Sequence, residues 1–315
     1  MKRVLFRIVA IVACWSLVVQ YSSVCSAATP SILEGESQDS INRAIYERVY
    51  EVVSPERDLP MPELVTLIAQ QFLETEYVAS TLEQTPEQLR VFLDKTDCIL
   101  FVELCSSFAL TVKGLKIVQA GNGKRYSLRS KPSVVTEESS YELLCENIRN
   151  MRYRLGVVDG YASRIHYTSE WILQNQTNGI LREFSRELGE EYKQDFYFMS
   201  AHPQRYFQLA EDSTQLARIR EVERHLAAQK PYYFISQEQL LKPGVMDEIR
   251  SGDIVCFMSK QGNGIDIAHV AIAFDVEGEM HFIHASYGAK KVKVEERTLA
   301  EYAKNGIRIL RFNKL

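Results

Sequence analysis

The sequence predicts an α+β fold in which one buried helix and an antiparallel sheet share a core. The first observation is a nearly continuous apolar run over 98–112, because a helix that is apolar on most sides is a buried helix. The second is a change of period after Gly252, where short β-branched segments alternate with turn residues. A buried helix followed by an antiparallel meander is typical of the α+β class.

Further helices are expected before this run. Apolar residues recur at helical spacing over 41–52, and Asp39-Ser40 precedes them where an N-cap belongs. A second helix is predicted over 64–73. Thr96 or Asp97 stands at the N-cap position of the buried helix.

The middle of the chain, about 114–240, is less regular and is interpreted as an insertion that shapes a substrate site. It contains a helical pattern over 215–229 and the sequence Gly121-Asn122-Gly123, which is interpreted as a hairpin turn because it lacks the spacing of a phosphate loop. The region from about 250 to 315 is expected to form the antiparallel sheet. Its predicted strands lie near 253–258, 267–274, 280–285, 291–295 and 307–312.

Residues 1–27 have the order of a bacterial secretory signal peptide. A basic start precedes an apolar run over 8–19, and small residues follow near Ala27. That run is shorter than the ~20 residues a membrane-spanning helix needs, although a membrane anchor is the alternative. We therefore expect a periplasmic or secreted protein without a stable membrane span.

Charge and length narrow the class of protein further. Residues 28–315 hold 34 basic and 41 acidic residues, a net charge of about −7 that argues against a nucleic-acid partner. A chain of this length and ordinary composition suits a single domain over 28–315 with a sizeable insertion. A monomer is expected.

Four cysteines follow the leader, namely Cys98, Cys105, Cys145 and Cys256. If Cys98 and Cys105 share a helix, the rise per residue separates them by about 10.5 Å, beyond the ~7 Å limit for a disulfide. A pairing of Cys105 with Cys145 or Cys256 stays open. One reactive thiol and three buried ones is the expected arrangement.

Cys98 is the candidate nucleophile because it begins the buried helix. A helix N-terminus lowers the pKa of a thiol through unpaired N–H groups, and the same groups can hold an oxyanion. The alternative is that Cys98 only packs.

Two histidines in neighbouring predicted strands favour the catalytic interpretation. If 275–278 is a four-residue hairpin loop, Phe274 pairs with Glu279 and His269 lies directly opposite His284. Directly opposed residues have Cβ atoms about 4.5–5.5 Å apart. One imidazole can then act as the base while the other fixes its tautomer, whereas the alternative is two histidines facing solvent.

A metal site is the competing use of such residues. His281 and His284 are three apart on a strand and so point to opposite faces. Cys256 has the apolar neighbours of a core strand residue. We therefore expect no metal and no cofactor.

Several motifs in this order resemble a known family. Asp97-Cys98 before a helix, Gly252-Asp253 before a strand, Ala268-His269-Val270-Ala271 and Ile283-His284-Ala285 resemble the NlpC-type peptidoglycan hydrolases. The stretch over 153–171 is similar to the hallmark of their N-acetylmuramoyl-L-alanine amidase-like subfamily. The resemblance runs from about residue 65 to the C-terminus and implies a papain-like (NlpC-type) core.

The resemblance implies Cys98 as nucleophile, His269 as general base and His284 as its orienting partner. It also implies that Tyr77 and Asp97 are substrate-binding residues, with Tyr77 near the thiol as support for the oxyanion site, although Tyr77 lacks the usual glycine and proline context. The implied reaction is cleavage of the amide between N-acetylmuramic acid and L-alanine in muropeptides or peptidoglycan fragments, through a cysteine thioester.

A cluster in the insertion suits such a substrate, because aromatic rings cover sugar faces and an arginine can bind a stem-peptide carboxylate. The alternative is local packing, with the arginine paired to a nearby acid. The cluster comprises Tyr161, Arg164, His166 and Tyr167.

Three other functions remain open at this point. A γ-D-glutamyl-diamino acid endopeptidase of the same fold is the first, but such enzymes often carry serine after the nucleophile, where this chain has Ile99. A non-catalytic protein that binds cell-wall fragments is the second. A thioester acyltransferase of related fold is the third.

Overall fold

The computed structural model describes residues 37–118, 137–229 and 231–315. The chain divides into two units, 1–40 and 41–315, and the elements below belong to the second apart from the first turn of α2. The expected signal peptide over 1–27 and the expected turn at 121–123 lie outside the described residues. Within these ranges no helix combines the length and apolar character needed to cross a bilayer.

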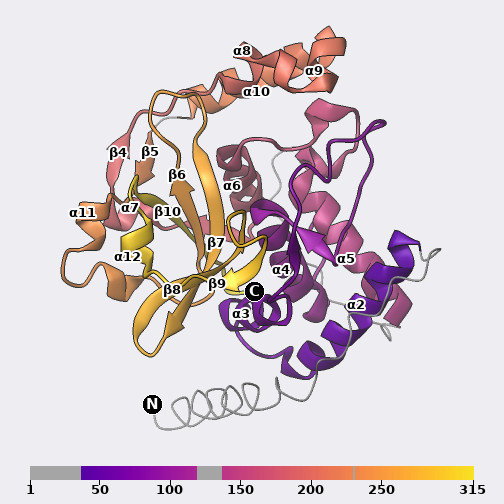
Figure 1. Ribbon diagram of the computed structural model, residues 1–315, viewed down its shortest axis with the longest axis vertical. Coiled ribbons are helices and arrows are strands. Elements are labelled where there is room, and N and C mark those ends of the chain that lie inside the picture. Colours follow the sequence, from indigo (N-terminus) through magenta and orange to yellow (C-terminus); the bar gives the residue numbers. More distant parts are fainter. Residues whose placement is uncertain (1–36, 119–136, 230) are drawn as a thin grey trace. The chain divides into compact units, whose positions relative to one another are not determined.

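A mixed sheet organises the second unit, with eight strands among the described residues in the order β2-β1-β9-β8-β7-β6-β10-β3 (Figure 1). The five predicted strands are confirmed, and with them the α+β class. They are β6 (Ile254–Met258), β7 (Ile267–Val276), β8 (Glu279–Ser286), β9 (Lys291–Val294) and β10 (Ile307–Phe312).

Three strands of this sheet were not predicted: β1 (Glu76–Tyr77), β2 (Lys95–Thr96) and β3 (Leu181–Glu183). Segments of two or three residues are too short to show the alternation that identifies a strand. β1 and β2 run parallel, so the sheet is not purely antiparallel as expected.

Side chains of the sheet alternate between two cores, as strand geometry requires. In β6, Cys256 belongs to the larger core and its neighbours Val255 and Phe257 belong to the smaller one. The larger core includes residues of α3 (Met61–Gln71), α4 (Cys98–Val112) and α5 (Glu137–Arg152). The smaller core includes residues of α11 (Gln237–Leu240) and α12 (Leu299–Tyr302), which lie across the sheet from α4 in Figure 1.

Helix α4 has the predicted bounds and the predicted cap. The Asp97 carboxylate accepts hydrogen bonds from the backbone N–H groups of Ile99 at 3.1 Å and Leu100 at 3.0 Å. From Leu100 to Val112 every residue is buried. The helix is thus held at its start by a side chain and along its length by packing, which fixes the position of Cys98.

The earlier helix begins sooner than predicted. Helix α2 (Gln38–Val53) includes Asp39-Ser40 in its first turn, so these residues do not form the N-cap. The Ser40 N–H instead donates to the Ser37 side-chain oxygen at 3.2 Å. Serine is a preferred N-cap residue, and Ser37 stands three residues before the N–H group from which its hydroxyl accepts a hydrogen bond.

The α-helices and strands not yet described are mostly short. The predicted helix over 215–229 is observed as α10 (Ser213–Ala228), capped by the Asp212 side chain. The remaining elements are α6 (Thr168–Thr177), α7 (Ser185–Leu188), α8 (Phe198–Ala201), α9 (Phe207–Glu211), β4 (Glu190–Tyr192) and β5 (Tyr232–Phe234).

The β7–β8 hairpin corrects the expected register. Its turn is the two residues Glu277 and Gly278, with φ of +55° and +92°, and Val276 pairs with Glu279. Two successive positive φ angles are the signature of a tight turn that matches strand twist, and glycine accommodates the second. The prediction that His269 and His284 are directly opposite was therefore wrong. Because the register is displaced by two residues, they are diagonal neighbours on the same face.

Candidate active site

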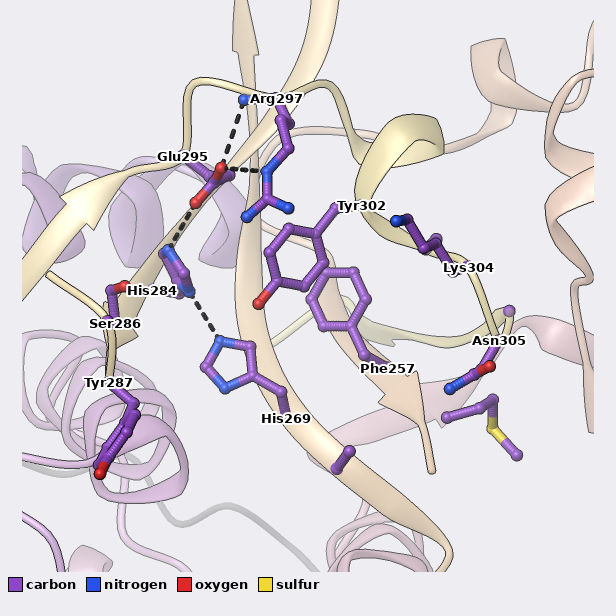
Figure 2. Close-up of a pocket in the computed structure, with 15 residues that line it drawn as sticks. Phe257, His269, His284, Ser286, Tyr287, Glu295, Arg297, Tyr302, Lys304 and Asn305 are labelled. Atoms are coloured by element: carbon purple, nitrogen blue, oxygen red, sulfur yellow. Dashed lines mark hydrogen bonds and ion pairs between the residues drawn. The ribbon is translucent and has the colours of Figure 1, made fainter. Parts of the chain in front are cut away.

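The two histidines form the centre of a connected chain of side chains. His269 Nε2 lies 2.7 Å from His284 Nδ1, and His284 Nε2 lies 3.3 Å from a carboxylate oxygen of Glu295. Arg297 Nε donates to the other Glu295 oxygen at 2.7 Å. Figure 2 shows this series, which we call the relay, running from His269 to Arg297.

The relay dictates a tautomer for each ring. A carboxylate accepts hydrogen bonds only, so Glu295 favours a proton on His284 Nε2 and leaves His284 Nδ1 as an acceptor. His269 Nε2 must then carry its proton toward His284, which leaves His269 Nδ1 as a free base. Sequence reasoning missed Glu295. It lies one residue past β9, and the β8–β9 pairing of His284 with Lys293 places it diagonally from His284.

Cys98 lies against the strand that carries His269. The backbone N–H groups of Val270, the residue after His269, and of Ile99 favour the ionised form of the thiol and lower its pKa. Burial, reinforced by the Asp97 charge, nevertheless raises the pKa of Cys98 to about 12. The N–H groups at the helix start lower this pKa as expected, but burial and the neighbouring carboxylate outweigh them.

The histidines are also held in their neutral forms. Burial, with the charge of His284, lowers the pKa of His269 to about 3. Burial lowers the pKa of His284 to about 4, although Glu295 opposes the shift. At neutral pH the site therefore holds a protonated thiol and two neutral imidazoles.

Tyr77 lies near the thiol, on strand β1. Burial, with the charge of Cys98, raises the pKa of Tyr77 to about 12, so its hydroxyl remains a hydrogen-bond donor at neutral pH. Its ring packs edge-on against Tyr287 at 5.6 Å between centroids. The parallel pairing of Tyr77 with Thr96 places Tyr77 near the start of α4. This pairing does the positioning although the glycine and proline usual beside such a tyrosine are missing.

Three residues of the insertion cluster come together, but around a local ion pair. Tyr161 and His166 have ring centroids 4.4 Å apart, and the Arg164 guanidinium lies 5.0 Å from the Tyr161 ring. Arg164 is buried and binds Glu83 at 2.9 Å and Glu87 at 3.3 Å. This is the alternative stated above, in which the arginine pairs with nearby acids.

Tyr167 does not join that group. Its buried hydroxyl donates to Glu223 at 2.7 Å and accepts the backbone N–H of Met199 at 3.2 Å. Tyr167 therefore ties α6 to α8 and α10 as part of the larger core.

A cavity of about 520 Å³ lies beside the relay and is lined by His269, His284 and Glu295 (Figure 2). Cys98 and the four residues of the insertion cluster are absent from its lining. In the described ranges no three His, Cys, Asp or Glu side chains converge as metal ligands would. The cavity walls also include Phe257, Met258, Ala268, Ser286, Tyr287, Gly288, Arg297, Tyr302, Ala303, Lys304, Asn305 and Gly306.

No disulfide joins any two of the four cysteines in the described ranges. Cys105 and Cys256 are buried, whereas Cys98 and Cys145 are partly exposed. Neither of the two pairings left open for Cys105 is formed.

The site combines a cysteine at the start of a buried helix with a neighbouring strand that carries a histidine, on an α+β fold. The AmiA-like family model, described as N-acetylmuramoyl-L-alanine amidase-like, matches residues 67–308. The chain belongs to this family. No match was found among curated proteins.

Solved structures agree with this placement. An N-acetylmuramoyl-L-alanine amidase from Bacteroides uniformis is 29% identical, with a TM-score of 0.67 over 81% of this chain and 99% of that one. A candidate xylanase from Bacteroides fragilis is also 29% identical, with a TM-score of 0.65 over 79% and 99%. A Legionella pneumophila protein, LPG0564, shares the fold at 18% identity, with a TM-score of 0.59 over 88% and 97%.

Glu295→Gln should lower kcat by about tenfold or more, because the amide can no longer fix the His284 tautomer. Loss of the carboxylate charge also lowers the histidine pKa values further, so the acid limb of the pH–rate profile should move to lower pH. Glu296→Gln is the matched control, since Glu296 is exposed and its one ion pair within the described residues is with Lys293. An unchanged kcat and profile in Glu295→Gln would remove Glu295 from the relay.

Proposed function

We propose that this protein is a cysteine hydrolase that cleaves the amide between N-acetylmuramic acid and L-alanine in muropeptides, with Cys98 as nucleophile. The observation that carries the proposal is the relay beside a thiol at a capped helix start. Family membership and the named Bacteroides uniformis amidase support the bond and the substrate class. The order of Cys98, His269 and His284 along the chain supports placing the fold among the NlpC-type papain-like hydrolases.

The neutral resting site implies general-base attack. His269 Nδ1 removes the thiol proton as Cys98 attacks the lactyl carbonyl, and the relay stabilises the resulting imidazolium through Glu295. His269 then protonates the leaving L-alanine nitrogen. Water, activated by the same histidine, hydrolyses the muramoyl thioester.

Two donors are available for the oxyanion formed in each step. The Asp97 cap uses the N–H groups of Ile99 and Leu100, which leaves the N–H of Cys98 itself. The protonated Tyr77 hydroxyl is the second donor in this proposal. One such donor is typically worth a factor of about 10²–10³ in kcat.

The pH–rate profile should reflect the lowered histidine pKa values. Protonation removes the base, so a lowered pKa moves the acid limb of kcat/KM to lower pH. We expect activity to hold from neutral pH down through 6.5 and to fall as pH approaches the values near 3 and 4 of the coupled pair. A limb at or above pH 6.5 would contradict a buried, neutral relay.

The competing functions differ in their products. Digestion of a defined disaccharide pentapeptide followed by mass spectrometry should yield an intact peptide that begins with L-alanine. Release of a fragment that begins with the diamino acid would identify the γ-D-glutamyl endopeptidase instead. No product with wild-type protein, together with measurable binding of the muropeptide, would identify a non-catalytic binding protein.

The same proposal places the protein outside the cytoplasm. A cell-wall substrate and the leader-like residues 1–27 both fit export to the periplasm or beyond. Muropeptides are the expected partners, and the expected state is a monomer.

A further inference from the structure

The cavity beside the relay lies on the histidine side of the site. His269 and His284 line it, whereas Cys98 does not. In thioester catalysis the acyl group becomes bonded to the thiol, and the leaving nitrogen must face the histidine that protonates it. The cavity is therefore placed to receive the part of the substrate attached to the leaving nitrogen.

Cations without a full set of partners stand at this cavity. Arg297 uses its Nε for Glu295 and is about half exposed, and its two terminal nitrogens have no hydrogen-bond partner among the described residues. Lys304 is exposed and makes no ion pair within the same ranges. Figure 2 shows Arg297 and Lys304 on either side of the Tyr302 ring, over which the guanidinium lies at 4.5 Å. The lining thus holds two cations against one carboxylate, that of Glu295.

We infer that this cavity binds the leaving stem peptide, with Arg297 and Lys304 as specificity determinants for a free α-carboxylate on its second residue. The inference rests on the proposed amidase function and extends it to the substrate's peptide side. Two extended residues span about 7 Å, so a carboxylate on the second residue is within reach of the cavity wall. Arginine is suited to this task because its terminal N–H groups form paired bonds with a carboxylate.

Arg297, rather than Arg164, is the arginine available to a substrate carboxylate. Arg164 is buried against Glu83 and Glu87, so its charge is already neutralised by the protein. The terminal nitrogens of Arg297 are available to a ligand, while its Nε donates a hydrogen bond to Glu295 in the relay. Arg297 would then bind the peptide carboxylate and also orient Glu295, which in turn holds the two histidines.

A matched pair of substrates tests this directly. N-acetylmuramoyl-L-alanyl-D-glutamate carries a free α-carboxylate on its second residue, and N-acetylmuramoyl-L-alanyl-D-isoglutamine has an amide at that position, while the γ-carboxylate is free in both. Wild-type kcat/KM should favour the acid by at least about tenfold, as expected for charge-assisted hydrogen bonds. Arg297→Gln and Lys304→Gln should each reduce this ratio toward one, mainly through KM for the acid.

The ratio separates recognition from catalysis. Arg297→Gln should also lower kcat for both substrates because Glu295 loses its partner, but that effect cancels in the ratio. Lys242→Gln is the control, since Lys242 is exposed and outside the cavity lining. Equal wild-type rates on both substrates, or a ratio retained in both variants, would overturn the inference and leave the amidase function standing. Failure of wild type to release alanyl peptides from either substrate would overturn both.

Discussion

Cys98→Ala should reduce the release of alanyl peptides from a muropeptide by about 10⁴-fold or more. Removal of a nucleophile from a concerted triad typically costs that much, because the remaining groups cannot form the covalent intermediate. The fold should survive, since α4 is capped by Asp97 and held by its buried length from Leu100 onward. Product release measured by chromatography checks the rate, and circular dichroism checks the fold.

Cys145→Ala is the matched control for that result. Cys145 is the other partly exposed thiol in the described ranges, and it lies on α5 away from the relay. It should keep activity within about twofold, as expected for a substitution away from the reacting groups. More than about one hundredth of wild-type activity in Cys98→Ala would show that the thiol is not the nucleophile.

The largest stability effect is expected from a buried ion pair at the far end of the sheet. Arg308 on β10 donates to both oxygens of Glu183 on β3, at 2.7 and 2.9 Å, and to Ser169 at 2.6 Å. Its side chain is only 2% exposed. Glu183→Ala leaves that charge buried without its carboxylate, which should cost about 3–5 kcal/mol of unfolding free energy. The midpoint of thermal unfolding should fall by about 10 °C.

A nearby exposed pair provides the comparison. Glu187 binds Arg182 at 3.1 Å, but both side chains are nearly half exposed. Glu187→Ala should therefore change the unfolding free energy by no more than about 1 kcal/mol. Similar losses from the two variants would show that burial of Arg308 is not what makes its pair important.

The parts of the site that depend on local signals could be predicted from the sequence. Helix α4 and its Asp97 cap follow from an apolar run and the residue before it, which need no knowledge of the fold. The strands of the meander follow from their alternation and turns. His269 and His284 share a face in both registers, because a shift of two residues preserves the face of a strand.

The parts that failed depend on tertiary structure. The register depended on the φ angles of Glu277 and Gly278, which the sequence did not specify uniquely. Arg164 is neutralised by Glu83, which is 81 residues earlier in the chain and cannot be identified as its partner by spacing. The thiol pKa was misjudged because burial of Cys98, rather than the helix start alone, determines it.

The identity of the group attached to Cys98 during turnover tests the central claim most directly. Wild-type protein mixed with a muropeptide, quenched in acid and digested with pepsin should give a Cys98-containing peptide that carries a muramoyl thioester. The peptide released at the same time should begin with L-alanine. An alanyl-glutamyl group on Cys98, or an adduct on any other residue, would contradict the claim that Cys98 attacks the lactyl carbonyl.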